Sequence, residues 1–160
     1  MKKLYHVSIL ISILLLQSCG YSPMLKNIEL KDMKISKIEY SGVSDLIYFL
    51  RSNLNIPITK GTKDAFIVKI SLRENASSVT KDTAGVTTQE KITISIAFEI
   101  LDTKNNTIGK ESITDSKTVR ITNNISTDAE IKRVEKENII TNLIQQLTFA
   151  IRAKIISSQK

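Results

Sequence analysis

The chain of 160 residues has no tryptophan, one histidine, one cysteine and two prolines. The histidine is His6 and the cysteine is Cys19, so both lie near the start of the chain. The sequence after Cys19 therefore lacks the side chains of His- or Cys-based zinc sites, of Cys–His and Ser–His nucleophiles and of Cys-ligated iron–sulfur clusters. An intrachain disulfide is also excluded, because a single cysteine has no partner.

Glycine is also scarce, with five residues, which argues together with the few prolines against a disordered or low-complexity chain. The length suits one domain. The formal net charge is +7, and it falls to +5 if a leader containing Lys2 and Lys3 is removed. Near its end the chain carries a basic cluster around Lys132, but glutamates interleave with it. We therefore expect a solvated helix surface there and no nucleic-acid partner.

Residues 1–18 have the layout of a signal peptide: a positive start, an apolar run from Val7 to Leu16, and then Cys19. The apolar run is too short for a membrane-spanning helix, which needs about 20 residues. Leu16-Gln17-Ser18-Cys19 resembles the lipobox at which bacterial lipoproteins are cleaved, although Gln17 departs from the usual pattern. The alternative is an ordinary secretory leader with a chance cysteine.

In a lipoprotein, Cys19 becomes the first residue and carries a covalent lipid, which is the only attached group that we expect. Several acyl chains would anchor the domain permanently, because each buried CH₂ contributes about 0.8 kcal/mol. Gly20 stands where many inner-membrane lipoproteins have aspartate, so the resemblance implies the periplasmic face of the outer membrane. Residues 19–27 then form a lipidated connector, and residues 28–160 form a single domain.

Apolar periodicity predicts a β-α-β-β-β-α order. The sequence favours an α+β two-layer sandwich, in which a four-stranded, mostly antiparallel sheet carries two helices on one face. The predicted strands are 35–40, preceded by an alternating pair at Ile28 and Leu30, then 65–72, 91–100 and an edge strand within 107–121; the predicted helices are 44–56 and 127–156.

Several boundaries have their own signals. Ser44 or Asp45 is expected to cap the first helix, and Thr127 with Glu130 forms a capping-box pattern for the second. The polar stretch 74–90 is either a loop or two strand extensions that meet near residues 81–85. Asn105-Asn106 predicts a hairpin turn, because asparagine tolerates positive φ.

No catalytic or metal site is expected, since none of the common nucleophile, phosphate-loop or EF-hand motifs occurs. Close acidic pairs such as Glu135 and Glu137, or Asp128 and Glu130, are two residues apart, so a helix points them to different sides. A carboxylate hydrolase remains an alternative class, and it would require two converging acids with raised pKa values. Our prediction is a protein that is not an enzyme.

A basic strip is the main candidate binding site. By period-2 alternation, Lys69, Arg73 and Lys91 share the polar face of two neighbouring strands. Such a strip could bind phosphates of an anionic lipid or acidic groups of a protein. The alternative is that lysines simply fill exposed strand positions in a lysine-rich chain.

Three segments carry a family resemblance. They are the start Cys19-Gly20-Tyr21-Ser22-Pro23-Met24, the strand 91–102 after Thr87-Thr88, and the helix start Asp128-Ala129-Glu130. Together with the order of elements they resemble the LPS-assembly lipoprotein LptE family. The departures are Gln17 and the lack of an arginine, often found in the family, near positions 89–91.

This resemblance implies an outer-membrane lipoprotein that binds and plugs the β-barrel LptD and assists the delivery and assembly of lipopolysaccharide. It also implies direct contact with lipopolysaccharide. A second hypothesis is an accessory lipoprotein of another trans-envelope transporter that binds lipids or small hydrophobic solutes. That hypothesis predicts an apolar ligand cavity.

Overall fold

The computed structural model describes residues 34–59 and 65–158. The predicted leader, Cys19, the connector and the pair Ile28 and Leu30 lie outside the described residues. The elements follow the predicted order and are β1 (Ile35–Gly42), α2 (Ser44–Asn53), β2 (Phe66–Lys81), β3 (Thr87–Leu101), β4 (Thr107–Arg120) and α3 (Ile125–Ser158).

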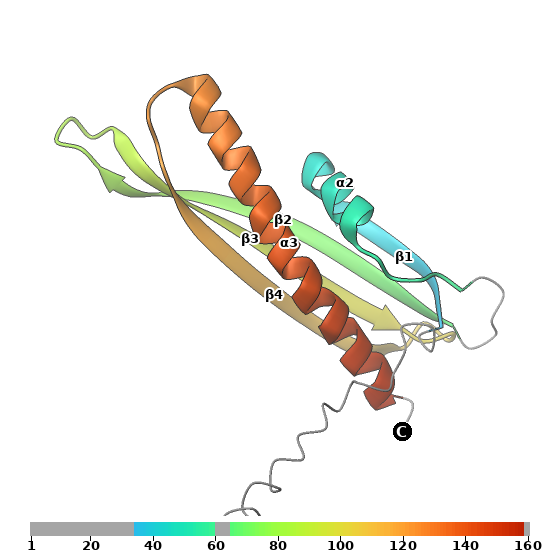
Figure 1. Cartoon of the computed structure of the whole chain (residues 1–160). Coiled ribbons are helices and arrows are strands. Elements are labelled where there is room, and N and C mark those ends of the chain that lie inside the picture. Colours follow the sequence, from blue (N-terminus) through green and yellow to red (C-terminus); the bar gives the residue numbers. More distant parts are fainter. Residues whose placement is uncertain (1–33, 60–64, 159–160) are drawn as a thin grey trace, which may run out of the picture. The chain divides into compact units, whose positions relative to one another are not determined.

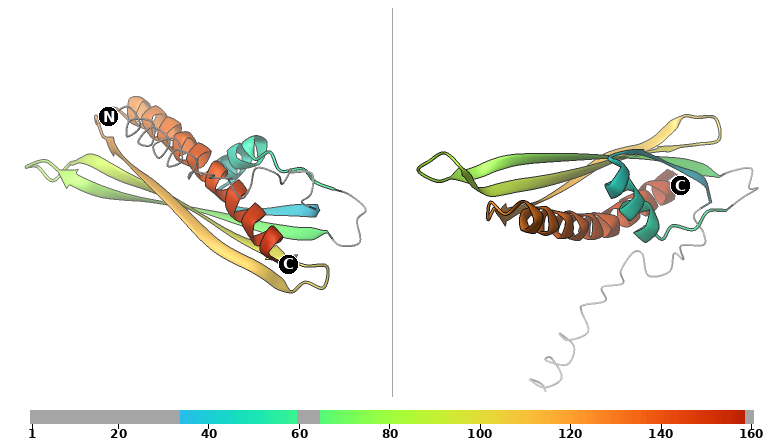
Figure 2. Two further views of the ribbon diagram at one scale, coloured as in Figure 1. Left: turned by 60° about the horizontal axis from the view of Figure 1, so that its bottom comes forward. Right: turned by 90° about the horizontal axis from the view of Figure 1, so that it is seen from above.

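The four strands form one sheet in the order β1-β2-β3-β4. β1 runs parallel to β2, and the two remaining pairs are antiparallel. Both helices cover the same face of this sheet, as the side view in Figure 2 shows. The predicted two-layer α+β sandwich, with its edge strand β4, is therefore confirmed.

The core lies between the sheet and α3. The alternate residues of β3 that face the helices, Ile92 to Ile100, are at most 1% exposed, as are Ile70 and Leu72 of β2. α3 contributes Ile139, Ile140, Leu143, Leu147, Ile151 and Ile155 to this core. Alternation in the strands and helical spacing in α3 therefore bury their apolar sides against each other, as predicted.

The polar stretch 74–90 forms two strand extensions, which was one of the two predicted alternatives. Figure 1 shows the β2–β3 hairpin reaching past the N-terminal end of α3, so the tip of the hairpin has no helix beneath it. Asp82 forms the turn by accepting the N–H groups of Ala84 and Val86, each at 2.9 Å. The β3–β4 turn repeats this arrangement with Asp102, and Asn105 there has φ +62° as expected.

Both predicted helix caps are wrong. Val43 is the N-cap of α2 and makes no side-chain cap, so Ser44 is already helical. α3 begins two residues before Thr127, because the side-chain oxygen of Asn124 accepts the N–H of Thr127 at 3.1 Å. The Asp128 carboxylate accepts instead from the N–H of Thr122 at 2.8 Å, a hydrogen bond that lowers its pKa.

The charged first half of α3 lies against the sheet and does not project from it. Lys132 contacts Glu90 of β3 and Lys136 contacts Glu74 of β2, each at 2.7 Å. All four side chains are partly buried. The ion pairs thus continue the helix–sheet contact beyond the apolar stripe.

Gly42, at the end of β1, cannot carry a side chain. Its φ is +134°, and a Cβ there would lie 2.2 Å from the carbonyl oxygen of Leu72. We expect Gly42→Ala to lower the free energy of unfolding by roughly 2–4 kcal/mol through strain and overpacking. Gly85→Ala is the matched control, because Gly85 also has positive φ but open space around it, and should lose only about 1 kcal/mol. Urea unfolding followed by circular dichroism measures both, and equal losses would contradict the steric explanation.

Candidate functional site: the open face of the sheet

The sheet face that the helices leave uncovered is the candidate site, and we call it the open face. Because side chains alternate along each strand, its residues follow from the pairing registers. Most carry hydroxyl or charged groups. They include Lys69, Ser71, Arg73, Asn75 and Ser77 of β2, Lys91, Thr93, Ser95, Ala97 and Glu99 of β3, and Lys110, Ser112, Thr114, Ser116, Thr118 and Arg120 of β4.

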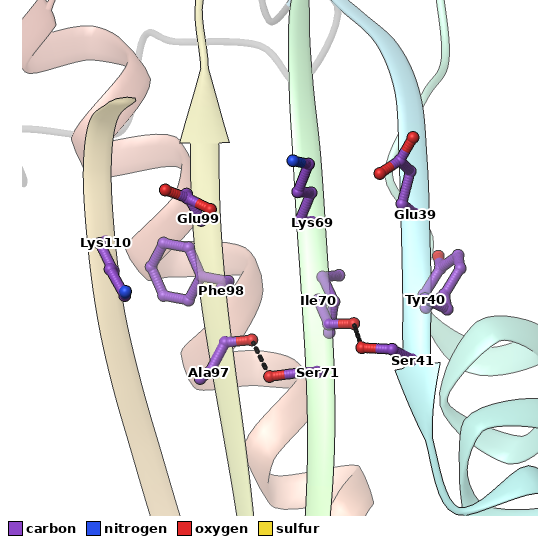
Figure 3. Close-up of a pocket in the computed structure, with 10 residues that line it drawn as sticks. All are labelled: Glu39, Tyr40, Ser41, Lys69, Ile70, Ser71, Ala97, Phe98, Glu99 and Lys110. Atoms are coloured by element: carbon purple, nitrogen blue, oxygen red, sulfur yellow. Dashed lines mark hydrogen bonds between the residues drawn. The ribbon is translucent and has the colours of Figure 1, made fainter. Parts of the chain in front are cut away.

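A row of alternating charges crosses all four strands at one end of this face. Glu39, Lys69, Glu99 and Lys110 stand opposite one another in successive registers. They line a shallow hollow of about 350 Å³ (Figure 3). Acidic neighbours therefore flank Lys69 on both sides and reduce its attraction for an external anion, although Glu39 forms its ion pair with Lys37, at 2.8 Å.

The other end of the open face is basic. Arg73 stands opposite Ser95, Lys91 lies between Ser77 and Thr118, and Arg120 is opposite Gln89, so polar uncharged residues surround all three. We call Arg73, Lys91 and Arg120 the basic end. A second hollow of about 630 Å³ adjoins Arg73, and its lining includes Asn75, Thr93, Ser95, Lys110, Ser112 and one acid, Glu74. Cationic and hydroxyl donors are the groups that bind phosphate.

Three acids of the strands lie on the helix-covered face, whereas Glu39 and Glu99 lie on the open face. Glu74, Glu90 and Glu111 lie on the helix-covered face, and each pairs with a lysine of α3: Lys136, Lys132 and Lys154. Arg73 and Lys91 are their direct chain neighbours but point the opposite way. The acids thus contribute to the helix–sheet contact, whereas the neighbouring bases remain exposed.

The three residues of the predicted strip lie on one face of the sheet, but they do not form a continuous strip. Lys69, Arg73 and Lys91 are all exposed on the open face. Successive members are four residues apart along the paired strands, which is about 13 Å, and Lys69 belongs to the charged row. Arg120 and Lys110 were missed. Alternation along β4 could have suggested them, but only the β3–β4 register places them beside the others.

The carboxyl pKa values that shift in the described part of the chain belong to Glu39, Asp102, Asp128 and Glu130. Each is lowered, chiefly because a neighbouring group donates a hydrogen bond to the carboxylate. An acid catalyst of the hydrolase type would need the opposite shift. Within residues 34–59 and 65–158, no three His, Cys, Asp or Glu side chains group as metal ligands would.

None of the described helices combines the length and the apolar character that a membrane span requires.

Comparison with known proteins supports the fold. No protein-family model and no curated protein sequence matches the chain. Among solved structures, rare lipoprotein B from Shewanella oneidensis matches with a TM-score of 0.61 and 8% identity, covering 78% of this chain and 100% of that one.

Two further lipoproteins are similar. A minor lipoprotein from Acinetobacter baumannii gives a TM-score of 0.53 at 17% identity, with 74% and 93% of the two chains covered. Lipoprotein B from Nitrosomonas europaea gives 0.52 at 11% identity, with 72% and 81% covered. None of these three names denotes an enzyme. At such identities the likeness shows a shared fold.

The charged row and the basic end should respond differently to charge reversal. Lys69→Glu places three acids side by side with Glu39 and Glu99, and we expect a loss of roughly 1 kcal/mol in the free energy of unfolding. Lys91→Glu is the matched control, because its neighbours Ser77 and Thr118 are uncharged, and should change stability by less than about 0.5 kcal/mol. Urea unfolding at low and high salt measures both. A Lys69→Glu loss that salt does not reduce would contradict the electrostatic explanation.

Proposed function

We propose that this chain is an outer-membrane lipoprotein, held at the periplasmic face by a lipid on Cys19, that binds the β-barrel LptD and contacts lipopolysaccharide. In this proposal the protein binds its partners and holds them in position, and it does not act as an enzyme. The sequence around Cys19 and the family resemblance support the anchor and the partner. The fold that the chain shares with several lipoproteins supports the anchor.

The observation that carries the proposal is the difference between the two sheet faces. The face with Glu74, Glu90 and Glu111 is covered by α3 and its lysines. The open face has Glu39 and Glu99 in the charged row at one end, and at its basic end it exposes Arg73, Lys91 and Arg120. A surface of this kind suits a partner that supplies negative charge.

Lipopolysaccharide has phosphate groups that match the basic end. Guanidinium groups such as those of Arg73 and Arg120 bind phosphate oxygens through two parallel hydrogen bonds, and Lys91 adds a point charge. Ser95, Thr93 and Asn75 beside Arg73 supply further polar groups. The basic end is thus the part of the predicted strip best suited to anion contact.

The hydroxyl-rich open face also suits the inside of a barrel. Outer-membrane barrels have a polar interior, which loops or a helix can plug. Ser71, Ser112, Thr114 and Ser116 give the open face a surface that can exchange hydrogen bonds with such a wall. A plug of this kind needs no apolar patch.

The alternative of an accessory lipoprotein for hydrophobic solutes needs an apolar ligand cavity. The space between sheet and helices is filled by side chains such as Ile96, Phe98, Leu143 and Leu147, which are at most 1% exposed. The hollows beside Lys69 and Arg73 are shallow, and charged side chains are part of their linings. A more apolar hollow lies beside Ile113 and Phe149, but it is open at the surface between β4 and α3 and does not enclose a ligand.

Copurification in detergent tests the proposal. The full chain is expressed with its leader in its native organism and extracted from the outer membrane. It should copurify with a barrel protein in stoichiometric amount. Cys19→Ser is the control for attachment, and it should appear in the soluble fraction with no acyl chain by mass spectrometry. Recovery of the acylated chain without any barrel partner would refute the partner assignment. Acylation at another residue would refute the anchor.

A further inference from the structure

Among the residues that the structure describes, none pairs with the outer edge of β4, unlike that of β1. The edge of β1 is partly covered, because the N–H of Thr59 donates to the carbonyl of Ile35 at 2.7 Å. β4 is a strand of 14 residues without proline that pairs with β3 on one side only. A long edge of this kind presents unpaired backbone groups to any extended chain that approaches it.

Two contacts identify the residues whose backbone groups point outward. The N–H of Ser116 donates to the Asp115 carboxylate at 2.7 Å, so it is turned away from β3. The hydroxyls of Ser95 and Thr114 approach within 2.9 Å, as expected for a pair whose backbones do not bond to each other. The even-numbered residues of β4 therefore direct their N–H and C=O groups to the outside.

Asp115 blocks only the second half of this edge from pairing with another strand. Its carboxylate accepts the N–H of Ser116, so this N–H is not free to pair with an added strand. In the first half, the outward N–H groups of Lys110, Ser112 and Thr114 meet no partner among the described residues of other elements. The open stretch thus covers residues 109–114.

A groove runs beside this open stretch, between β4 and α3. It has a volume of about 460 Å³ and is lined by Glu111, Ile113, Gln145, Gln146, Phe149 and Ala150. Phe149 is 58% exposed, which is unusual for a large aromatic side chain. An apolar side chain from an added strand would cover Phe149 and Ile113.

The charges along the open stretch indicate which side chains an added strand should carry. Glu111, on the groove side, already lies 3.5 Å from Lys154. Lys110, on the other side, is exposed. An added strand would therefore gain most from an apolar residue against Ile113 and an acidic residue against Lys110.

We propose that residues 109–114 of β4 bind an extended segment of a partner protein by antiparallel strand addition, with an apolar side chain in the Phe149 groove and an acidic one beside Lys110. Main-chain hydrogen bonds supply affinity in this mode, and the alternate side chains supply specificity. A second copy fits less well, because antiparallel self-pairing of this stretch about Ser112 sets Glu111 against Ile113 and Thr114 against Lys110, and so supplies neither the apolar nor the acidic residue. The inference does not depend on the barrel or on lipopolysaccharide.

A synthetic peptide tests the inference on the full chain. The probe is fluorescein-labelled Thr-Val-Thr-Val-Glu-Val-Thr, which places valine against Ile113 and glutamate against Lys110. Fluorescence anisotropy should show saturable binding. The same peptide N-methylated at its third and fifth residues loses the N–H groups that would donate opposite Ser112 and Lys110, and it should bind at least tenfold more weakly.

Phe149→Ala should weaken binding of the unmodified peptide about tenfold. Tyr48→Ala, which removes an exposed aromatic residue of α2 outside the groove, is the matched control and should leave binding unchanged. Failure of the probe to bind, equal binding of the N-methylated peptide, or equal effects of the two alanine variants would overturn the inference. A chain dimer that the peptide does not dissociate would assign the edge to a second copy and would overturn it as well.

Discussion

The register between β2 and β3 is the constraint on which the rest of the structure depends. It sets Ile96 against Leu72 and Phe98 against Ile70 on the face that α3 covers. A slip of one residue would turn either set of side chains to the opposite face. Because the apolar residues of β3 alternate without interruption from Ile92 to Ile100, a one-residue slip would expose one of the two apolar sets and is therefore excluded.

The same register places neighbouring charged residues on opposite faces of the sheet. Glu74 and Arg73 are adjacent in sequence, yet one forms an ion pair with Lys136 under the helix and the other is exposed on the open face. The acids on the covered face are thus used within the fold. A basic, hydroxyl-rich surface and one free strand edge remain available to partners, and they lie on different parts of the sheet.

Strong apolar periodicity made most of the fold predictable. The strand 91–100, the helical stripe from Ile140 to Ile155 and the turn at Asn105 follow from local patterns. The extensions of β2 and β3 to Lys81 and Thr87 were ambiguous, because a hairpin that reaches past its covering helix has no apolar residues to mark it. The cap at Asn124 was missed because the Thr127 pattern competed with it one turn later.

The site was predictable only where a single strand determines it. Alternation placed Lys69, Arg73 and Lys91 on the correct face. It could not show that Glu39 and Glu99 flank Lys69 or that Arg120 lies near Lys91, since these neighbours come from other strands. The groove at Phe149 was likewise invisible, because it joins residues of α3 and β4.

The most direct test of the proposed role is the binding of purified lipopolysaccharide by a variant in which Arg73, Lys91 and Arg120 are all replaced by Glu. A control variant with Lys34→Glu, Arg51→Glu and Lys104→Glu changes the net charge equally at exposed positions outside the basic end. We predict at least a tenfold loss of affinity for the first variant and a much smaller loss for the control. Equal affinities of the two variants, with both folded by circular dichroism, would contradict the assignment of the basic end.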